Sequence, residues 1–91
     1  MPLRVNLKIS GRVQGVCFRH YCRECALSLG LKGFVRNDPS GDVVIAAEGK
    51  REALRSFVLW CRRGPPGASV RECEENYEKP DGKFESFSIE L

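Results

Sequence analysis

The chain has 91 residues, of which 42% are hydrophobic, and its 15 basic and 12 acidic residues leave a formal net charge of +3. This length and apolar content fit one domain with a modest core, residues 1–91, and they exclude a disordered chain. The charge is too small to indicate nucleic-acid binding by itself, although a basic excess suits an anionic substrate.

The N-terminal residues alternate between apolar and polar side chains, so they lack the continuous apolar segment of a signal peptide. No stretch approaches the ~18 apolar residues that a transmembrane helix needs. An odd number of cysteines without an export signal favours free thiols in a reducing compartment. We therefore expect a cytoplasmic protein with no membrane partner, whose five cysteines are Cys17, Cys22, Cys25, Cys61 and Cys73.

The first third of the chain predicts a strand, a loop and a helix. Apolar and polar residues alternate over 3–9, which is typical of a strand with one buried face. A loop is expected at 10–18. Apolar side chains then recur at the i, i+3, i+4, i+7 spacing of an amphipathic helix, which predicts a helix over 19–29 that Gly30 ends. The residues on this apolar stripe are Cys22, Cys25, Ala26 and Leu29.

The middle of the chain predicts a hairpin followed by a second helix. Short apolar stretches at 33–36 and 43–47 flank 37–42, whose Asn, Asp, Pro, Ser and Gly residues are typical of a turn. The helical spacing of apolar residues returns over 51–62, and the sequence Gly-Pro-Pro-Gly at 64–67 ends that helix.

Two further strands are predicted at 69–77 and 87–91, separated by a turn at 79–82. Two helices that each carry one apolar stripe need a common sheet face to cover. The order of elements matches the split βαβ arrangement. We therefore predict an α+β fold of the ferredoxin-like type, with a four- to five-stranded antiparallel sheet covered on one face by two helices.

The loop before the first helix has the chemistry of an oxyanion site. It contains Gly11 and Gly15, and it leads to Arg19 at the helix start. A turn of this kind lines up backbone N–H groups into an anion-binding nest, and a helix N-terminus adds free N–H groups and the positive end of its dipole. The planar guanidinium of Arg19 can bind two oxygens of a phosphate or carboxylate. The loop therefore indicates a phosphoryl-binding site.

The stretches Gly-Arg-Val-Gln-Gly-Val-Cys-Phe-Arg at 11–19 and Gly-Phe-Val-Arg-Asn-Asp-Pro-Ser-Gly at 33–41 resemble two conserved blocks of the acylphosphatase family. The second block corresponds to 33–37 followed by 38–41, and the spacing of the blocks and the total length also fit. The resemblance implies the ferredoxin-like fold, hydrolysis of acyl phosphates, a phosphate-binding role for Arg19 and a water-orienting role for Asn37. The first block, which carries the resemblance most specifically, reads Gly11-Arg12-Val13-Gln14-Gly15-Val16-Cys17-Phe18-Arg19.

The chemistry of an acyl phosphate agrees with these roles. Its leaving group is a carboxylate whose conjugate acid has a pKa of about 4, so it departs without a strong general acid. The reaction needs a fixed phosphoryl group, neutralised charge and an oriented water. Asn37, at the end of the second predicted strand, is a short neutral side chain that can both donate and accept hydrogen bonds. The phosphate-binding backbone is predicted at Gln14, Gly15, Val16, Cys17, Phe18 and Arg19.

These observations lead to one expected function. We expect a monomer that hydrolyses a small-molecule acyl phosphate by one-step, in-line attack of water. The predicted mechanism uses no metal and no cofactor, and no nucleic acid takes part.

A cysteine-dependent phosphatase is one alternative. Cys17, five intervening residues and Arg23 formally match the pattern of those enzymes. In those enzymes the intervening residues form the phosphate loop, where small side chains allow close backbone approach. Here they are mostly bulky and overlap the predicted helix, so we expect Cys17 to be a loop residue rather than a thiolate nucleophile.

An RNA-binding module of similar fold is a second alternative. The stretch Lys32-Gly33-Phe34-Val35 resembles the start of the signature of such modules. These modules stack bases on aromatic side chains of the two central strands, whereas neither 3–9 nor 43–47 contains an aromatic residue. We expect no RNA binding.

The remaining histidine and cysteines have simpler interpretations. The apolar stripes of the two helices carry Cys22, Cys25 and Cys61, so we expect buried thiols that could face one another. Zinc binding is weakly indicated, because no histidine follows them at ligand spacing. We expect His20 to lie on the surface of the first helical turn.

Overall fold

The structure, a computed structural model, describes residues 1–90, and it contains every predicted element within three residues of its expected ends. Leu91, which the predicted last strand includes, lies outside the described residues. The elements are β1 (Pro2–Arg12), α1 (Phe18–Ser28), β2 (Lys32–Asn37), β3 (Val43–Lys50), α2 (Arg51–Arg63), β4 (Ser69–Glu78) and β5 (Phe87–Glu90).

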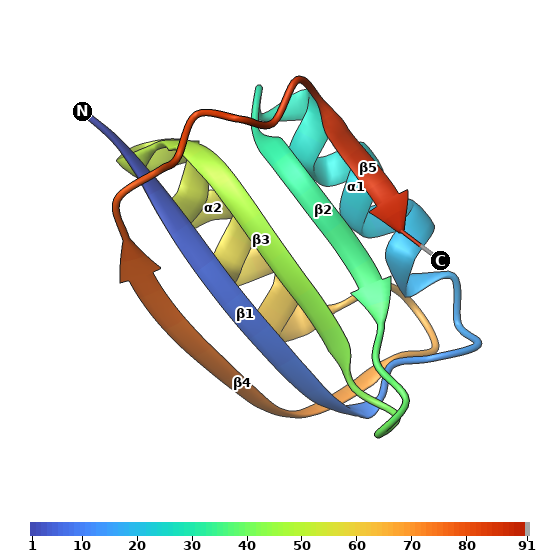
Figure 1. Cartoon of the computed structure of the whole chain (residues 1–91). Helices are drawn as coiled ribbons and strands as arrows, with labels where there is room; N and C mark the ends of the chain where they lie inside the picture. Colours follow the sequence, from blue (N-terminus) through green and yellow to red (C-terminus); the bar gives the residue numbers. More distant parts are fainter. Residues whose placement is uncertain (91) are drawn as a thin grey trace.

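The strands form one sheet in the order β4-β1-β3-β2-β5, and both helices cover the same face (Figure 1). β3 pairs antiparallel with β1 and with β2, and β4 pairs antiparallel with β1. The predicted ferredoxin-like α+β fold and the predicted hairpin of β2 and β3 are therefore confirmed.

The fifth strand differs from the prediction. β5 pairs parallel with β2, so the sheet is mixed and the expectation of a wholly antiparallel sheet is wrong at this edge. β5 reverses the direction of β4, as in a hairpin, but the segment 79–86 crosses over one end of the sheet to the opposite edge (Figure 1). At that edge, β5 therefore runs parallel to its neighbour β2.

The spacing of apolar residues in the sequence correctly identified the buried faces of the strands and helices. Val5, Leu7 and Ile9 of β1 are each at most 2% exposed, and they pack against the apolar stripes of both helices. Burial of such side chains contributes about 1.5–3 kcal/mol each. Neither helix in the described chain has the length and apolar content that a membrane crossing requires. The buried residues on the helix stripes are Phe18, Cys22, Ala26, Leu54, Phe57, Val58 and Cys61.

The crossing segment 79–86 is anchored by a buried carboxylate on β3. Glu48 is 8% exposed and accepts hydrogen bonds from the backbone N–H groups of Asp81 (3.1 Å) and Gly82 (3.2 Å). Arg4 of β1 lies 3.7 Å from the Glu48 carboxylate and 3.6 Å from that of Asp81. This arrangement fixes the path of the chain from β4 to β5.

The loop between β1 and α1 is shorter than predicted. Gly11 belongs to β1, where it opposes Val70 of β4 at a β-bulge. Its φ angle is 122°, and a Cβ atom there would lie 2.2 Å from the carbonyl oxygen of Ser69. Gly11 therefore allows close strand pairing rather than loop geometry, and the bulge ends the strand at the start of the candidate site.

Candidate active site

A hollow of about 420 Å³ opens where β1 leads into α1, at the end of the sheet where β2 also ends (Figure 1). Arg19 and Asn37, the two side chains predicted to act on substrate, both line it. The structure thus brings together residues from two separate predicted blocks. The hollow is lined by Val13, Gly15, Cys17, Phe18, Arg19, His20, Asn37 and Ile89.

The loop before α1 presents unpaired backbone donors. Gly15 (φ 75°) and Cys17 (φ 60°, ψ 25°) both adopt positive φ angles, and Cys17 is the one non-glycine residue in the described chain that does so. The N–H groups of residues 15–20 donate to no protein acceptor within residues 1–90. Alternation of ordinary and left-handed conformations turns successive N–H groups towards a common point, which is the geometry of an anion nest.

The N-terminus of α1 adds to this electropositive region. Cys17 is the N-cap and forms no side-chain cap hydrogen bond, and the first turn of the helix carries no acidic residue. The first N–H groups of a helix lack intrahelical partners, and the helix dipole makes this end positive. An oxyanion bound here receives hydrogen bonds that the protein does not make with itself.

Arg19 is the fixed positive charge of the hollow. It lies in the first turn of α1, is half-buried, and forms no ion pair with any residue of the described chain. An exposed arginine on a helix commonly pairs with a neighbouring carboxylate. The guanidinium of Arg19 is instead left available to bind an anion in the hollow.

Asn37 contributes a buried acceptor without a partner. It is the last residue of β2, and its side-chain Oδ1 is buried and accepts no hydrogen bond within residues 1–90. A buried polar atom in this state costs about 1–3 kcal/mol. A water or ligand atom in the hollow that donates to Oδ1 recovers that free energy.

The side chain of Gln14 joins two loops of the fold. Its side-chain amide donates to the carbonyl oxygens of Asp38 (2.9 Å) and Asp42 (3.0 Å), at the two ends of the β2–β3 turn. It therefore ties the loop before α1 to the turn that follows Asn37, and it does not line the hollow. Val16 is partly buried against the core and is not among the residues that line the hollow.

The β2–β3 turn is itself well ordered by hydrogen bonds. The N–H of Asp38 donates to the carbonyl of Asp42 (2.8 Å), and that of Gly41 donates to the carbonyl of Asp38 (2.9 Å). Ser40 donates both its hydroxyl and its N–H to the Asp38 carboxylate, which lowers the pKa of that group. The turn therefore holds the end of β2, and with it Asn37, in a defined place.

Three lining residues were not predicted as parts of the site: Val13, His20 and Ile89. His20 was expected on the surface, and it is exposed, yet it also borders the hollow. Its position directly after Arg19 in the first helical turn is the sequence signal that could have indicated this. Ile89 of β5 also lines the hollow. No sequence signal identifies it, because its position depends on the parallel pairing of β5 with β2.

Two of the three cysteines expected to be buried, Cys22 and Cys61, are buried, whereas Cys25 is half-buried. Cys22 and Cys61 are fully buried and face each other across the two helices, and burial, followed by the contact with Cys22, raises the pKa of Cys61 well above its ordinary value. Such thiols are unreactive. No three His, Cys, Asp or Glu side chains in the described chain are placed to hold a metal ion.

The other two alternatives lack structural support. The residues that follow Cys17 form helix α1 rather than a phosphate loop, so a cysteine-dependent phosphatase site is not favoured. On the face of the sheet opposite the helices, Phe34 packs against Phe84 of the crossing segment, with ring centroids 5.9 Å apart. The central strands β1 and β3 carry no aromatic side chain on which a base could stack, so an RNA-binding module is not favoured.

Fold and site together define a class: a ferredoxin-like α+β domain with a loop of unpaired backbone N–H groups at its first strand–helix junction. The sequence matches the acylphosphatase family over residues 5–89. An acylphosphatase of Aeropyrum pernix is 47% identical over 88 residues, which cover 96% of this chain and 87% of that protein. The chain belongs to the acylphosphatase family and is an acylphosphatase enzyme.

Solved structures show the same similarity in three dimensions. The crystal structure of acylphosphatase from Bacillus subtilis superposes with a TM-score of 0.94 at 35% identity and covers 98% of this chain and 99% of that one. An acylphosphatase from Coxiella burnetii superposes with a TM-score of 0.92 at 31% identity, over 98% of this chain and 93% of that one.

Proposed function

We propose that this chain hydrolyses the carboxyl–phosphate bond of acyl phosphates by direct attack of water, and that Arg19, the loop backbone and Asn37 form the catalytic site. The observation that carries this proposal is the meeting of three unpaired groups in one hollow. These are the guanidinium of Arg19, the free N–H groups of residues 15–20 and the buried Oδ1 of Asn37.

Arg19 and the loop N–H groups bind the phosphoryl group in this mechanism. The guanidinium and the N–H groups neutralise charge on the non-bridging oxygens, and they do so in a fixed geometry that needs little rearrangement during the reaction. The predicted backbone contacts come from residues 14–19. The free N–H groups at the start of α1 support this assignment for 15–19, and the anchored side chain of Gln14 supports a role in holding the loop.

Asn37 orients the attacking water. Its unpartnered Oδ1 accepts a hydrogen bond from the water, whose oxygen then faces the phosphorus. As the new P–O bond forms, the bond from phosphorus to the acyl oxygen breaks, and its electron pair leaves with the carboxylate. The water proton passes to a phosphate oxygen or to solvent. Because the carboxylate is a good leaving group, no general acid and no metal ion are required.

Kinetics with benzoyl phosphate in the presence of EDTA test these roles. We expect Arg19→Ala and Asn37→Ala to lower kcat/KM by about 10²–10³ each, since each removes one preorganised contact with the transition state. Cys17→Ser should retain near-normal activity. Arg23→Ala is the matched control, because Arg23 lies on the same helix and does not line the hollow. Collapse of activity in Cys17→Ser alone would contradict the proposal in favour of a thiolate nucleophile.

A single turnover in isotopically labelled water tests the site of attack. Attack at phosphorus places the label in inorganic phosphate, whereas attack at the carbonyl carbon places it in the carboxylate. Label in the carboxylate would overturn the mechanism.

We further propose that the chain acts as a cytoplasmic monomer with one domain over residues 1–91. Its five cysteines are all free, which is typical of a reducing compartment. One copy of the chain supplies every residue that lines the hollow, which supports activity without assembly. Light scattering coupled to size-exclusion chromatography tests the monomer, and a dimer mass at assay concentration contradicts it.

A further inference from the structure

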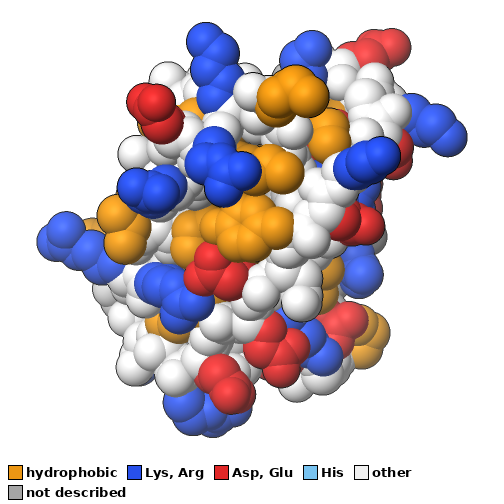
Figure 2. Space-filling view, turned by 90° about the vertical axis from the view of Figure 1, so that its left-hand side faces the viewer, with side chains coloured by type: hydrophobic (Ala, Val, Ile, Leu, Met, Phe, Trp, Pro, Cys, Tyr) orange, Lys and Arg blue, Asp and Glu red, His pale blue; other side chains and the backbone are white. Residues whose placement is uncertain are grey.

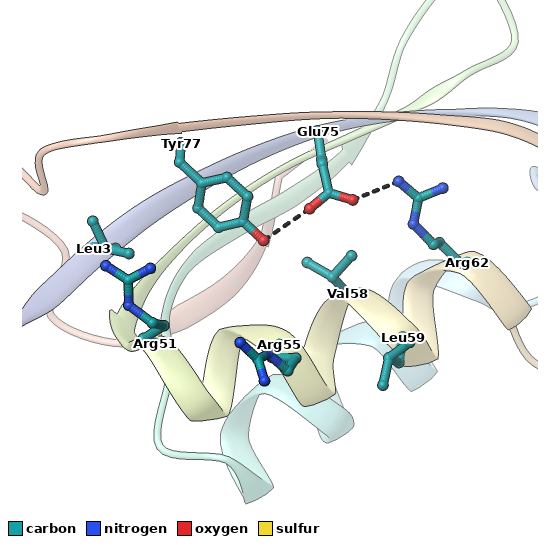
Figure 3. Close-up of a pocket in the computed structure, with 8 residues that line it drawn as sticks. All are labelled: Leu3, Arg51, Arg55, Val58, Leu59, Arg62, Glu75 and Tyr77. Atoms are coloured by element: carbon teal, nitrogen blue, oxygen red, sulfur yellow. Dashed lines mark hydrogen bonds and ion pairs between the residues drawn. The ribbon is translucent and has the colours of Figure 1, made fainter.

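A second concave surface lies between α2 and β4, and none of its lining residues belongs to the candidate active site. Figure 3 shows this groove, with Glu75 and Tyr77 projecting from β4 towards the helix. Its volume is about 500 Å³, within the range of small-molecule sites. The apolar side chains that line it are Leu3, Val58, Leu59 and Tyr77.

The apolar part of the groove is unusually open to solvent. Leu59 is 65% exposed and Tyr77 is 48% exposed, which places them among the few large hydrophobic side chains on the surface of the described chain. Figure 2 shows the face of the molecule with β4, where hydrophobic side chains gather near the middle and Lys and Arg side chains lie around them. Such a patch rimmed by polar residues is typical of a binding site.

Two arginines of α2 carry unneutralised charge in the groove: Arg51 at the end next to Leu3, and Arg55 one helical turn further along (Figure 3). Arg51 and Arg55 line it, and neither forms an ion pair within residues 1–90. They are spaced i, i+4, so their charges repel each other, and Arg51 lies at the positive N-terminus of α2. Helix stability therefore does not explain them. A bound anion removes both sources of repulsion.

The opposite end of the groove is already neutralised. Arg62 pairs with the carboxylate of Glu75, which also accepts a hydrogen bond from the Tyr77 hydroxyl (2.8 Å). Arg51 lies at the end next to Leu3, and Arg62 lies at the far end (Figure 3). The groove is thus positive at one end, apolar along its floor and closed to a second negative charge by Glu75.

We propose that this groove binds a small amphipathic anion, with one carboxylate or phosphate group at Arg51 and Arg55 and an apolar body over Val58, Leu59 and Tyr77. The polarity of the groove sets both the orientation and the class of the ligand. A dianion with charge at both ends places its second negative charge against the carboxylate of Glu75, which repels it. A neutral apolar molecule leaves the two arginines without a counter-ion. This site is independent of the proposed catalytic mechanism.

Titration of the isotope-labelled protein with phenylbutyrate, followed by two-dimensional NMR, tests the proposal. We expect saturable shifts in residues 51–62 of α2 and 75–77 of β4, and none in residues 14–19. Phenylbutanol, which lacks the charge, and butyrate, which lacks the ring, should bind at least about tenfold more weakly, since each loses one of the two interactions. Phenylbutyl phosphate, compared with phenylbutyrate at the same residues, shows which anionic group the arginines prefer.

Charge-removing variants assign the binding to the groove. The double variant Arg51→Gln, Arg55→Gln should weaken phenylbutyrate binding about tenfold. Arg63→Gln is the matched control, because it removes a charge from the same helix but lines a different hollow. Leu59→Ser tests the apolar floor at an exposed position where the fold tolerates the change. Equal weakening by Arg63→Gln, shifts confined to residues 14–19 and 37, or the absence of saturable shifts in α2 and β4 would each overturn the proposal.

Discussion

Two regions of this molecule direct backbone N–H groups towards an anion, and they differ in whether the protein supplies that anion. At the crossing segment, the N–H groups of Asp81 and Gly82 donate to the buried carboxylate of Glu48. At the start of α1, the N–H groups of 15–20 have no acceptor in the described chain, and Arg19 beside them has no counter-ion. The first region is internally complete, and in the proposed function a substrate completes the second.

The difference shows how stability and activity are distributed. Paired donors stabilise the folded state, whereas unpaired donors and the strained φ angle of Cys17 (60°) lower its stability. In the proposed function, a bound phosphoryl group makes the interactions that the loop before α1 lacks. Changes at the crossing segment should therefore affect stability alone, and changes at the loop should affect activity first.

The largest expected effect is the loss of activity in Arg19→Lys. Lysine keeps the positive charge but lacks the planar two-pronged donor, so kcat/KM for benzoyl phosphate should fall about 10²-fold. The free energy of unfolding should stay within about 0.5 kcal/mol of the wild type, because Arg19 has no partner in the described chain to lose. Steady-state kinetics and urea denaturation measure the two quantities. Retained activity would show that charge alone suffices.

The next effect is a loss of stability in Glu48→Ala. Removing the carboxylate leaves the N–H groups of Asp81 and Gly82 without their acceptor and removes one of the carboxylates around Arg4, which should cost about 2 kcal/mol of unfolding free energy. Glu78→Ala is the control, because Glu78 pairs with the same Arg4 but is 57% exposed, and it should cost less than about 0.5 kcal/mol. Both variants should keep the wild-type kcat. A lower kcat in Glu48→Ala would remove the separation between the two regions.

A smaller effect of opposite sign is expected for Cys17→Gly. Glycine adopts a φ of 60° without strain, so the variant should be more stable by up to about 1 kcal/mol. Cys17→Ala retains the Cβ atom and the strain, and it separates conformational relief from loss of the thiol. Thermal unfolding of the three proteins measures the difference. Equal stability of the Gly and Ala variants would mean that the left-handed conformation stores no strain.

The smallest effect concerns pH and the ion pair at the far end of the groove. Hydrogen bonds from Arg62 and then Tyr77 lower the pKa of Glu75 below its ordinary value of 4.5. The ionised form is the stabilising one, so its contribution is complete above the unfolded pKa and is lost as pH falls through the lowered folded pKa. Glu75→Gln should cost a few tenths of a kcal/mol at neutral pH and nothing in acid.

Urea denaturation of the wild type, Glu75→Gln and Glu74→Gln at neutral and acidic pH measures this dependence. Glu74 is an exposed neighbour on β4 that forms no ion pair in the described chain, so its variant should follow the wild type at both pH values. A constant difference between the wild type and Glu75→Gln across this range would contradict the lowered pKa.

The amino-acid sequence by itself determined the elements of this protein and the two side chains at the centre of its candidate site. The spacing of apolar residues along the sequence predicts whether a segment forms a strand or a helix, and it indicates which face of that element is buried. Arg19 and Asn37 could be singled out because each lies at the end of an element, where side chains and free N–H groups can meet a ligand.

Only the tertiary structure decided which strand edges pair and which ends of strands and helices lie together. Ile89 reaches the hollow because β5 pairs parallel with β2, and Glu48 contacts Asp81 because the chain crosses the end of the sheet. The groove between α2 and β4 likewise combines residues far apart in the sequence. The physical reason is that the spacing of apolar residues indicates which face of an element is buried, but not which other element packs against that face. The choice of partner depends on long-range pairing and on single polar contacts that no local pattern encodes.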